Sequence, residues 1–131
     1  MSERILLIDD DVDDQLIFRE MIQEIAPPIE CIVAGNGVEG LGILAKTQPP
    51  PAIIFLDLNM PLINGWECLE RIKMNDRLNQ IPIVILTTSD NKADKKKTLE
   101  QGASKFLTKT ADLGLLRQGI REILKAERLV E

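Results

Sequence analysis

Five polar side chains of this 131-residue chain stand where apolar, strand-like segments end. They are Asp9, Asp10, Asp57, Thr87 and Lys109. Asp57 directly follows the apolar run 53–56 and precedes a turn-forming segment. A carboxylate placed this way can accept a phosphoryl group as a nucleophile, and hydroxyl and ammonium groups can donate hydrogen bonds to phosphoryl oxygens. We therefore expect Asp57 to be a phosphoryl acceptor, with Thr87 and Lys109 as contacts of the phosphoryl group.

The clustered carboxylates require a counter-charge. Two carboxylates 4 Å apart repel each other by about 4 kcal/mol at an effective dielectric constant near 20. A divalent cation removes this repulsion at neutral pH, and Mg²⁺ prefers hard oxygen ligands while leaving positions open for a phosphate. We expect Asp10 to bind Mg²⁺, with Asp9 acting directly or through water, so that the metal neutralises charge on the transferred group.

The chain contains no histidine. This excludes Ser-His and Cys-His nucleophilic sites within the chain, and also an internal phosphohistidine. The phosphoryl donor must therefore be another molecule. Cys31 and Cys68 are the only cysteines and lack CxxC spacing, so we expect reduced thiols rather than a zinc site or a disulfide.

The hydrophobic pattern predicts the elements that position these side chains. Strand-length apolar runs occupy residues 4–8, 29–34, 53–56, 81–86 and 104–107. Apolar residues at helical spacing follow each run, which gives a regular βα alternation. Right-handed crossovers then produce a parallel sheet covered by helices on both faces. Because the carboxyl ends of parallel strands share one edge of the sheet, the five polar side chains should converge there.

Several local features are also predicted. Leu16 and Leu113 are expected on the apolar stripes of the first and last helices. Gly65, in the turn signature Asn64-Gly65, is expected to take a positive φ. One of residues 88–90 should cap the polar helix 91–101, whose few apolar positions include Leu99. The tail at residues 126–131 is expected to fray.

The composition excludes several classes of protein. With 44% hydrophobic and 28% charged residues and a net charge of −5, the chain resembles an ordinary soluble domain without a bias toward nucleic acid or anionic membranes. No apolar stretch is long enough to span a membrane. The segment before the first strand is too short and too acidic for a signal peptide. We expect one cytoplasmic domain without a second domain or linker.

Four motifs, in this order, resemble the receiver domain of bacterial two-component response regulators. They are Ile5-Leu6-Leu7-Ile8-Asp9-Asp10, Phe55-Leu56-Asp57-Leu58-Asn59-Met60-Pro61 with Asn64-Gly65, Leu86-Thr87, and Phe106-Leu107-Thr108-Lys109. The likeness spans residues 4–128, and we expect no separate output domain. It implies a flavodoxin-like, doubly wound α/β fold, with five parallel strands in the order 2-1-3-4-5 and five helices.

The resemblance also implies a chemistry. Asp57 would be phosphorylated by a sensor histidine kinase or a histidine phosphotransfer protein. The implied Mg²⁺ ligands are the side chains of Asp9, Asp10 and Asp57 and the main-chain carbonyl of Asn59. Thr87 would move toward the phosphoryl group and Phe106 would turn inward, which would alter the surface of the fourth helix, fifth strand and fifth helix.

We expect a single-domain response regulator that is not an enzyme beyond its own phosphorylation and dephosphorylation. Its output would be a surface bound by a downstream protein, or onward transfer of the phosphoryl group. It would be a monomer or weak dimer, without direct nucleic-acid contact or membrane insertion.

Two positions depart from the family pattern. The family usually has proline after the lysine, often joined by a cis bond, whereas this chain has Thr110. A cis bond before a residue other than proline costs about 3–4 kcal/mol, so this bond is expected to be trans with a shifted loop, or cis and strained. The residue after Thr87 is usually very small, and the bulkier Thr88 is expected to slow phosphoryl exchange.

Simpler interpretations stand beside these. The acidic run 9–14 could serve merely to stabilise the start of a helix, without binding a metal. Lys109 could be an ordinary surface lysine. Phe106 suits a sheet core as well as a switch. Residues 95–97, three lysines, are more typical of a solvated helix face than of a docking or nucleic-acid surface. Trp66 is expected to face outward, where it could contact a partner or report on the site.

Rival functions follow from the same residues. A receiver-like scaffold could bind partners without phosphorylation. A phosphatase with an aspartyl-phosphate intermediate usually has a second acid two residues beyond the nucleophile, where this chain has Asn59. A flavodoxin-like nucleotide-binding protein is disfavoured because no glycine-rich loop follows the first strand.

Overall fold

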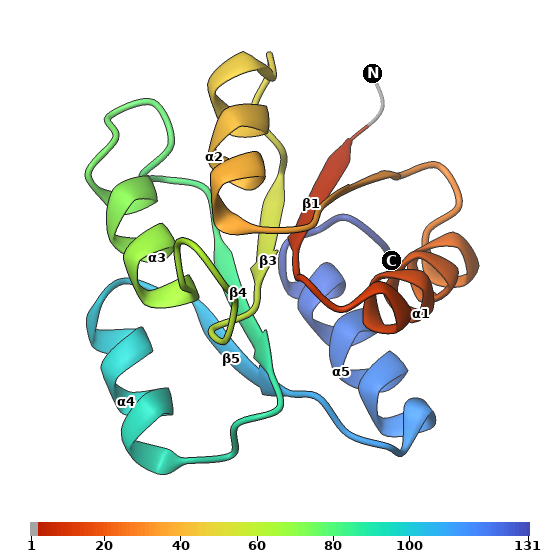
Figure 1. The fold of residues 1–131 in the computed structure, drawn as a ribbon. Coiled ribbons are helices and arrows are strands. Elements are labelled where there is room, and N and C mark those ends of the chain that lie inside the picture. Colours follow the sequence, from red (N-terminus) through yellow and green to blue (C-terminus); the bar gives the residue numbers. More distant parts are fainter. Residues whose placement is uncertain (1–2) are drawn as a thin grey trace.

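A computed structural model describes residues 3–131, so the first two residues of the N-terminal segment considered above lie outside the described part. The strands are β1 (Arg4–Ile8), β2 (Glu30–Ala34), β3 (Ile53–Leu56), β4 (Ile83–Thr87) and β5 (Lys105–Thr108). The helices are α1 (Val12–Ile25), α2 (Gly37–Lys46), α3 (Gly65–Lys73), α4 (Lys92–Glu100) and α5 (Leu113–Ala126). Strands and helices alternate along the chain (Figure 1).

All neighbouring strands are parallel, in the order β2-β1-β3-β4-β5. The predicted flavodoxin-like fold is therefore confirmed. Helices α2, α3 and α4 lie on one side of the sheet, and α1 and α5 lie on the other (Figure 1). Among the described residues, no helix has the length and apolar character needed to cross a membrane.

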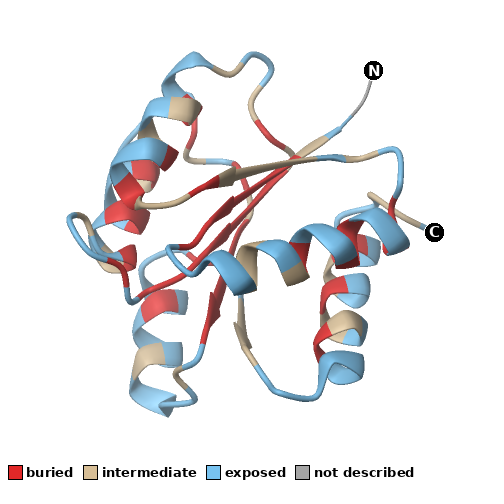
Figure 2. Ribbon diagram, turned by 45° about the vertical axis from the view of Figure 1, so that its right-hand side comes forward, coloured by how far each residue is buried: buried red, intermediate tan, exposed pale blue. Residues whose placement is uncertain are grey.

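The three central strands are buried on both faces, which Figure 2 shows as a red sheet between mostly pale-blue outer helix surfaces. Successive residues alternate between the two cores, since side chains of a strand point to opposite faces. Ile54 and Leu56 pack toward α2 and α3, whereas Ile53 and Phe55 pack toward α1 and α5. This double burial explains why these strands appear in the sequence as continuous apolar runs.

Three expectations about the helices and the tail are wrong. Leu16 is 56% exposed, because the inward stripe of α1 runs through Phe18 instead. Leu113 is 45% exposed, because the buried stripe of α5 begins at Leu116. The Phe18 ring meets Phe55 edge-on, with 4.9 Å between ring centroids. The C-terminal tail folds back: the Leu129 amide donates to the Leu124 carbonyl at 2.8 Å, and the Leu129 side chain packs on the core.

Helix α4 differs from the expectation at its start and on its inner face. Its N-cap is Asn91, whose side chain accepts hydrogen bonds from the next turn, so none of residues 88–90 caps it. The one buried side chain of α4 is Thr98, while Leu99 is 39% exposed. A helix held by so little apolar burial is more easily displaced than its neighbours.

The two thiols are free, as expected, and lie in different cores on opposite faces of the sheet. Cys68 is fully buried and Cys31 half-buried. Burial raises the pKa of each thiol from 9.0 to about 11. Only the thiolate reacts with alkylating agents, so both should react slowly at neutral pH.

We expect the native protein to resist iodoacetamide at pH 8, because a pKa near 11 lowers the thiolate fraction about a hundredfold relative to a pKa of 9. Labelling should become faster as the pH rises, because a raised pKa means that thiolate appears only as the pH approaches 11. Intact mass spectrometry measures the label, and the protein in denaturant is the control. Fast labelling of Cys68 in the native protein would contradict the buried assignment.

Candidate functional site

Asp9 and Asp57 stand side by side at the carboxyl edge of the sheet. The Asp9 amide donates to the Ala34 carbonyl at 3.0 Å, and the Asp57 amide donates to the Ile8 carbonyl at 3.0 Å. These bonds continue the β1–β2 and β1–β3 ladders by one residue beyond the strands. Asp9 is 1% exposed and Asp57 is 6% exposed. Two carboxylates are therefore held out of bulk water by backbone hydrogen bonding.

The residues expected to bind a metal come together. Asp9, Asp10 and Asp57 each offer a carboxylate oxygen, and these oxygens lie within 4.8 Å of one another. Asp10 is exposed, so the cluster opens to solvent. The buried Asp9 Oδ2 atom is paired with the Lys109 ammonium group at 2.7 Å, and its remaining lone pairs can serve a cation or a metal-bound water. This hard-oxygen donor set fits Mg²⁺ or Mn²⁺.

Lys109 reaches the cluster from the segment that follows β5. Its Nζ atom lies 2.7 Å from Asp9 Oδ2, 2.8 Å from Asp14 Oδ2 and 3.4 Å from Asp57 Oδ2. The Lys109 amide donates to the Thr87 carbonyl at 2.6 Å. Lys109 is therefore a site residue and not a surface lysine.

Burial and charge act against each other in this cluster. Desolvation raises the pKa of Asp9, although the Lys109 ammonium group and the Asp11 amide partly oppose the rise. Burial alone would lower the pKa of Lys109, but its hydrogen bonds to Asp14 and Asp9 outweigh that effect and raise it. Lys109 thus stays cationic throughout the physiological range.

The peptide bond between Lys109 and Thr110 is trans, since among the described residues only Gln48–Pro49 is cis. Of the two alternatives predicted for this bond, the trans form is the one observed. The hydrogen bond to the Thr87 carbonyl positions the Lys109 backbone without a proline.

Thr87 and Phe106 lie on the same face of the sheet. Ile85 pairs with Phe106 in the β4–β5 ladder, so their side chains point to the same face of the sheet. Thr87 is two residues after Ile85 in β4 and therefore also points to that face. Thr87 is fully buried, and Phe106 is half-buried against the core under α2 and α3. The arrangement lets Phe106 contribute to the core, and its movement as a switch stays a prediction.

Gly65 does not take the expected positive φ. The left-handed residue in the loop between β3 and α3 is the exposed Leu62, with φ 68°. Glycine is required at 65 because a Cβ atom there would lie 2.2 Å from the Asp57 carbonyl oxygen. The start of α3 thus packs directly on the backbone that carries the acceptor. Asn59 turns beside it, its amide 3.4 Å from Asp57 Oδ1, and its carbonyl as a metal ligand stays a prediction.

Trp66 does not face outward as expected. It is half-buried against the core, and the Lys97 Nζ atom lies 4.7 Å from its ring centroid. The contact joins α3 to α4, so a displacement of α4 would change the surroundings of the indole ring. The neighbouring Lys95 and Lys96 are exposed, and the Lys96 Nζ atom lies 4.0 Å from Glu100 Oε1.

Sequence reasoning missed two residues of the first helix. Asp14 pairs with Lys109, and the Gln15 side chain donates to the Asp9 carbonyl at 2.7 Å. Asp14 lies in the first turn of α1, at the end of the acidic run 9–14, and membership of that run was the available signal. The partner 95 residues away could not be read from it.

Comparison with known proteins gives a consistent result. The family profile described as the response regulator receiver domain matches residues 5–121. Response regulator Rcp1 of Synechocystis is 34% identical over 114 residues, which are 83% of this chain and 78% of Rcp1. Protein PilH of Pseudomonas aeruginosa is 30% identical over 121 residues, covering 92% of this chain and 97% of PilH.

Solved structures agree in fold. The phosphorylated cyanobacterial phytochrome response regulator RcpA superposes with a TM-score of 0.87 at 29% identity, covering 95% of this chain and 93% of RcpA. The Mn²⁺-bound form of Rcp1 superposes with a TM-score of 0.78 at 32% identity, covering 94% and 92%.

Proposed function

Since the chain belongs to the response regulator receiver family, we propose that it is a single-domain response regulator that accepts a phosphoryl group on Asp57 in a Mg²⁺-dependent reaction. The observation that carries the proposal is the convergence of one buried acceptor carboxylate, an acidic pair and one lysine at a single sheet edge. Residues 4–128 form the receiver domain in this proposal.

The proposed reaction is a phosphoryl transfer from a phosphohistidine. An Asp57 carboxylate oxygen attacks phosphorus as the phosphorus–nitrogen bond breaks, and the imidazole leaves with the electron pair. Lys109 and the Thr87 hydroxyl donate to the phosphoryl oxygens. Asp9, Asp10, Asp57 and the Asn59 carbonyl would hold the metal, which when bound supplies positive charge to the phosphoryl oxygens.

The donor would be a histidine kinase or a histidine phosphotransfer protein, because the chain has no histidine of its own. A phytochrome-type kinase is the first donor to test, since RcpA is a phytochrome response regulator. Mg²⁺ is proposed as the metal, supported by the oxygen cluster and by the Mn²⁺-bound form of Rcp1. The protein would act in the cytoplasm.

The proposed output is a change in the α4-β5-α5 surface, read by a downstream protein. Helix α4 supports this because Thr98 is its one buried side chain. Thr87 and Phe106 share one face of the sheet, so a movement of the Thr87 hydroxyl toward Asp57 would leave space for the ring. The chain would catalyse nothing beyond its own phosphorylation and dephosphorylation.

Incubation with acetyl phosphate and Mg²⁺ tests the proposal. We expect intact mass spectrometry to detect one added phosphoryl group, and the rate to fall at least about tenfold in EDTA because carboxylate repulsion then goes uncompensated. Beryllofluoride with Mg²⁺ should change Trp66 fluorescence through its contact with Lys97.

The possible negative results of these experiments distinguish the rival functions. No phosphoryl uptake and no beryllofluoride response would contradict the proposal and favour a scaffold that binds partners without phosphorylation. Sustained release of phosphate from phosphate esters would instead favour a phosphatase.

A further inference from the structure

The Lys109 ammonium group is already shared among three carboxylates before a phosphoryl group arrives. An ammonium group carries three N–H donors and no acceptor. Three carboxylates surround it, with Nζ 2.7 Å from Asp9, 2.8 Å from Asp14 and 3.4 Å from Asp57. A phosphoryl oxygen on Asp57 must therefore compete with these carboxylates for the ammonium group.

The three carboxylates differ in how easily they release Lys109. The Asp9 side chain is 1% exposed and is also held by the Asp11 amide at 3.0 Å, so its carboxylate would be left without compensation inside the protein. Asp57 carries the phosphoryl group itself. The Asp14 side chain is 35% exposed on the first turn of α1, where water can solvate it at little cost. Asp14 is therefore the partner that can exchange.

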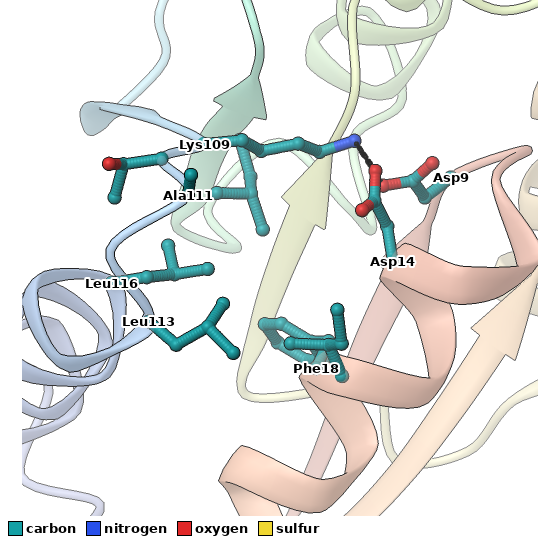
Figure 3. A pocket seen from close by; sticks show the side chains of 10 residues that line it. Asp9, Asp14, Phe18, Lys109, Ala111, Leu113 and Leu116 are labelled. Carbon is teal, nitrogen blue, oxygen red and sulfur yellow. Dashed lines mark hydrogen bonds and ion pairs between the residues drawn. The ribbon is translucent and has the colours of Figure 1, made fainter.

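The surroundings of the lysine stem also allow a shift. Figure 3 shows the Lys109 side chain crossing from the segment before α5 to α1, where it meets Asp14 and Asp9. Beside it lies a cavity of about 210 Å³ with mainly apolar walls. The apolar lining residues are Ile17, Phe18, Leu86, Ala111, Leu113 and Leu116. The stem borders open space there, so Nζ can move without displacing a packed side chain.

We propose that Asp14 is a positioning residue of the phosphoryl site, which holds the Lys109 ammonium group on α1 and sets how readily it turns to the phosphoryl group on Asp57. The inference rests on the proposed function of Asp57 and adds a control element from α1. In this proposal the contact between Asp14 and Lys109 is loosened when Asp57 is phosphorylated.

Replacing Asp14 by asparagine should therefore speed phosphorylation by acetyl phosphate at saturating Mg²⁺. We expect a two- to fivefold increase over wild type, roughly the worth of one partly exposed ion pair. Asp14→Ser is a second neutral variant suited to a first helical turn. Asp14→Glu keeps the charge and should restore a rate near that of wild type. Saturating Mg²⁺ removes any effect of the lost charge on metal affinity.

Asp13→Asn is the matched control. It removes the same charge from the adjacent, exposed position of α1, which makes no ion pair with Lys109. It should leave the rate near that of wild type. If both neutral Asp14 variants match Asp13→Asn, the role of Asp14 is wrong while the phosphorylation of Asp57 stands. If wild type and all variants stay unphosphorylated, the proposed function itself is wrong.

Discussion

An Asp57→Asn variant is expected to lose phosphoryl uptake by more than about a hundredfold, while remaining folded. The amide is nearly isosteric with the carboxylate but is not a nucleophile. Its oxygen can still accept from the Asn59 amide, as Asp57 Oδ1 does at 3.4 Å. Lys109 keeps its ion pairs with Asp9 and Asp14, so the ammonium group stays compensated.

Intact mass after acetyl phosphate treatment measures the uptake, and thermal unfolding measures the fold. We expect the free energy of unfolding to change by less than about 1 kcal/mol, because the variant removes one negative charge from a crowded acidic cluster. Asp13→Asn, with the same change of charge outside the cluster, should be phosphorylated normally. Uptake retained in Asp57→Asn would assign the phosphoryl group to another residue.

A Gly65→Ala variant is expected to lower the free energy of unfolding by about 3 kcal/mol. The added Cβ atom would lie 2.2 Å from the Asp57 carbonyl oxygen and 2.5 Å from Leu58 Cα. Both are backbone atoms, which cannot rotate aside as a flexible side chain could. Helix α3 or the acceptor segment must therefore move.

Urea denaturation measures the loss, and acetyl phosphate uptake should be slower in the same variant because the Asp57 backbone is displaced. Gly42→Ala is the matched control, since a Cβ atom at 42 meets nothing within 4 Å inside α2. Alanine there should be neutral, or stabilising by up to about 1 kcal/mol. Equal stability of the two variants would show that α3 does not press on the acceptor backbone.

The sequence predicted most of the fold because its buried parallel strands leave a local signal. Residues 53–56 form a continuous apolar run, and β3 occupies those residues. The buried residues of the helices were harder to predict, because a periodic apolar stripe does not indicate which of its residues contacts the sheet. Leu16 fits the period of α1 as well as Phe18 does, yet Leu16 is exposed and Phe18 meets Phe55.

Loops were predicted by residue type, and their geometry was not. Gly65 was expected to be a conformational glycine, but it is required by the close approach of two backbones. The left-handed residue of that loop is Leu62, for which the sequence carries no preference. Close approach depends on where a helix packs, which the residue types of one loop do not contain.

The sequence by itself determined the strand ends, and hence that Asp9, Asp10, Asp57 and Lys109 would meet at one edge of a parallel sheet. Only the tertiary structure decided which carboxylates Lys109 contacts. Asp14 was one acidic residue of a run until the fold placed it 2.8 Å from a lysine 95 positions away. The parallel sheet and its strand ends follow from local patterns and chain connectivity, and the strand order was implied by the family resemblance. Such a pairing depends instead on how α1 packs against the segment after β5.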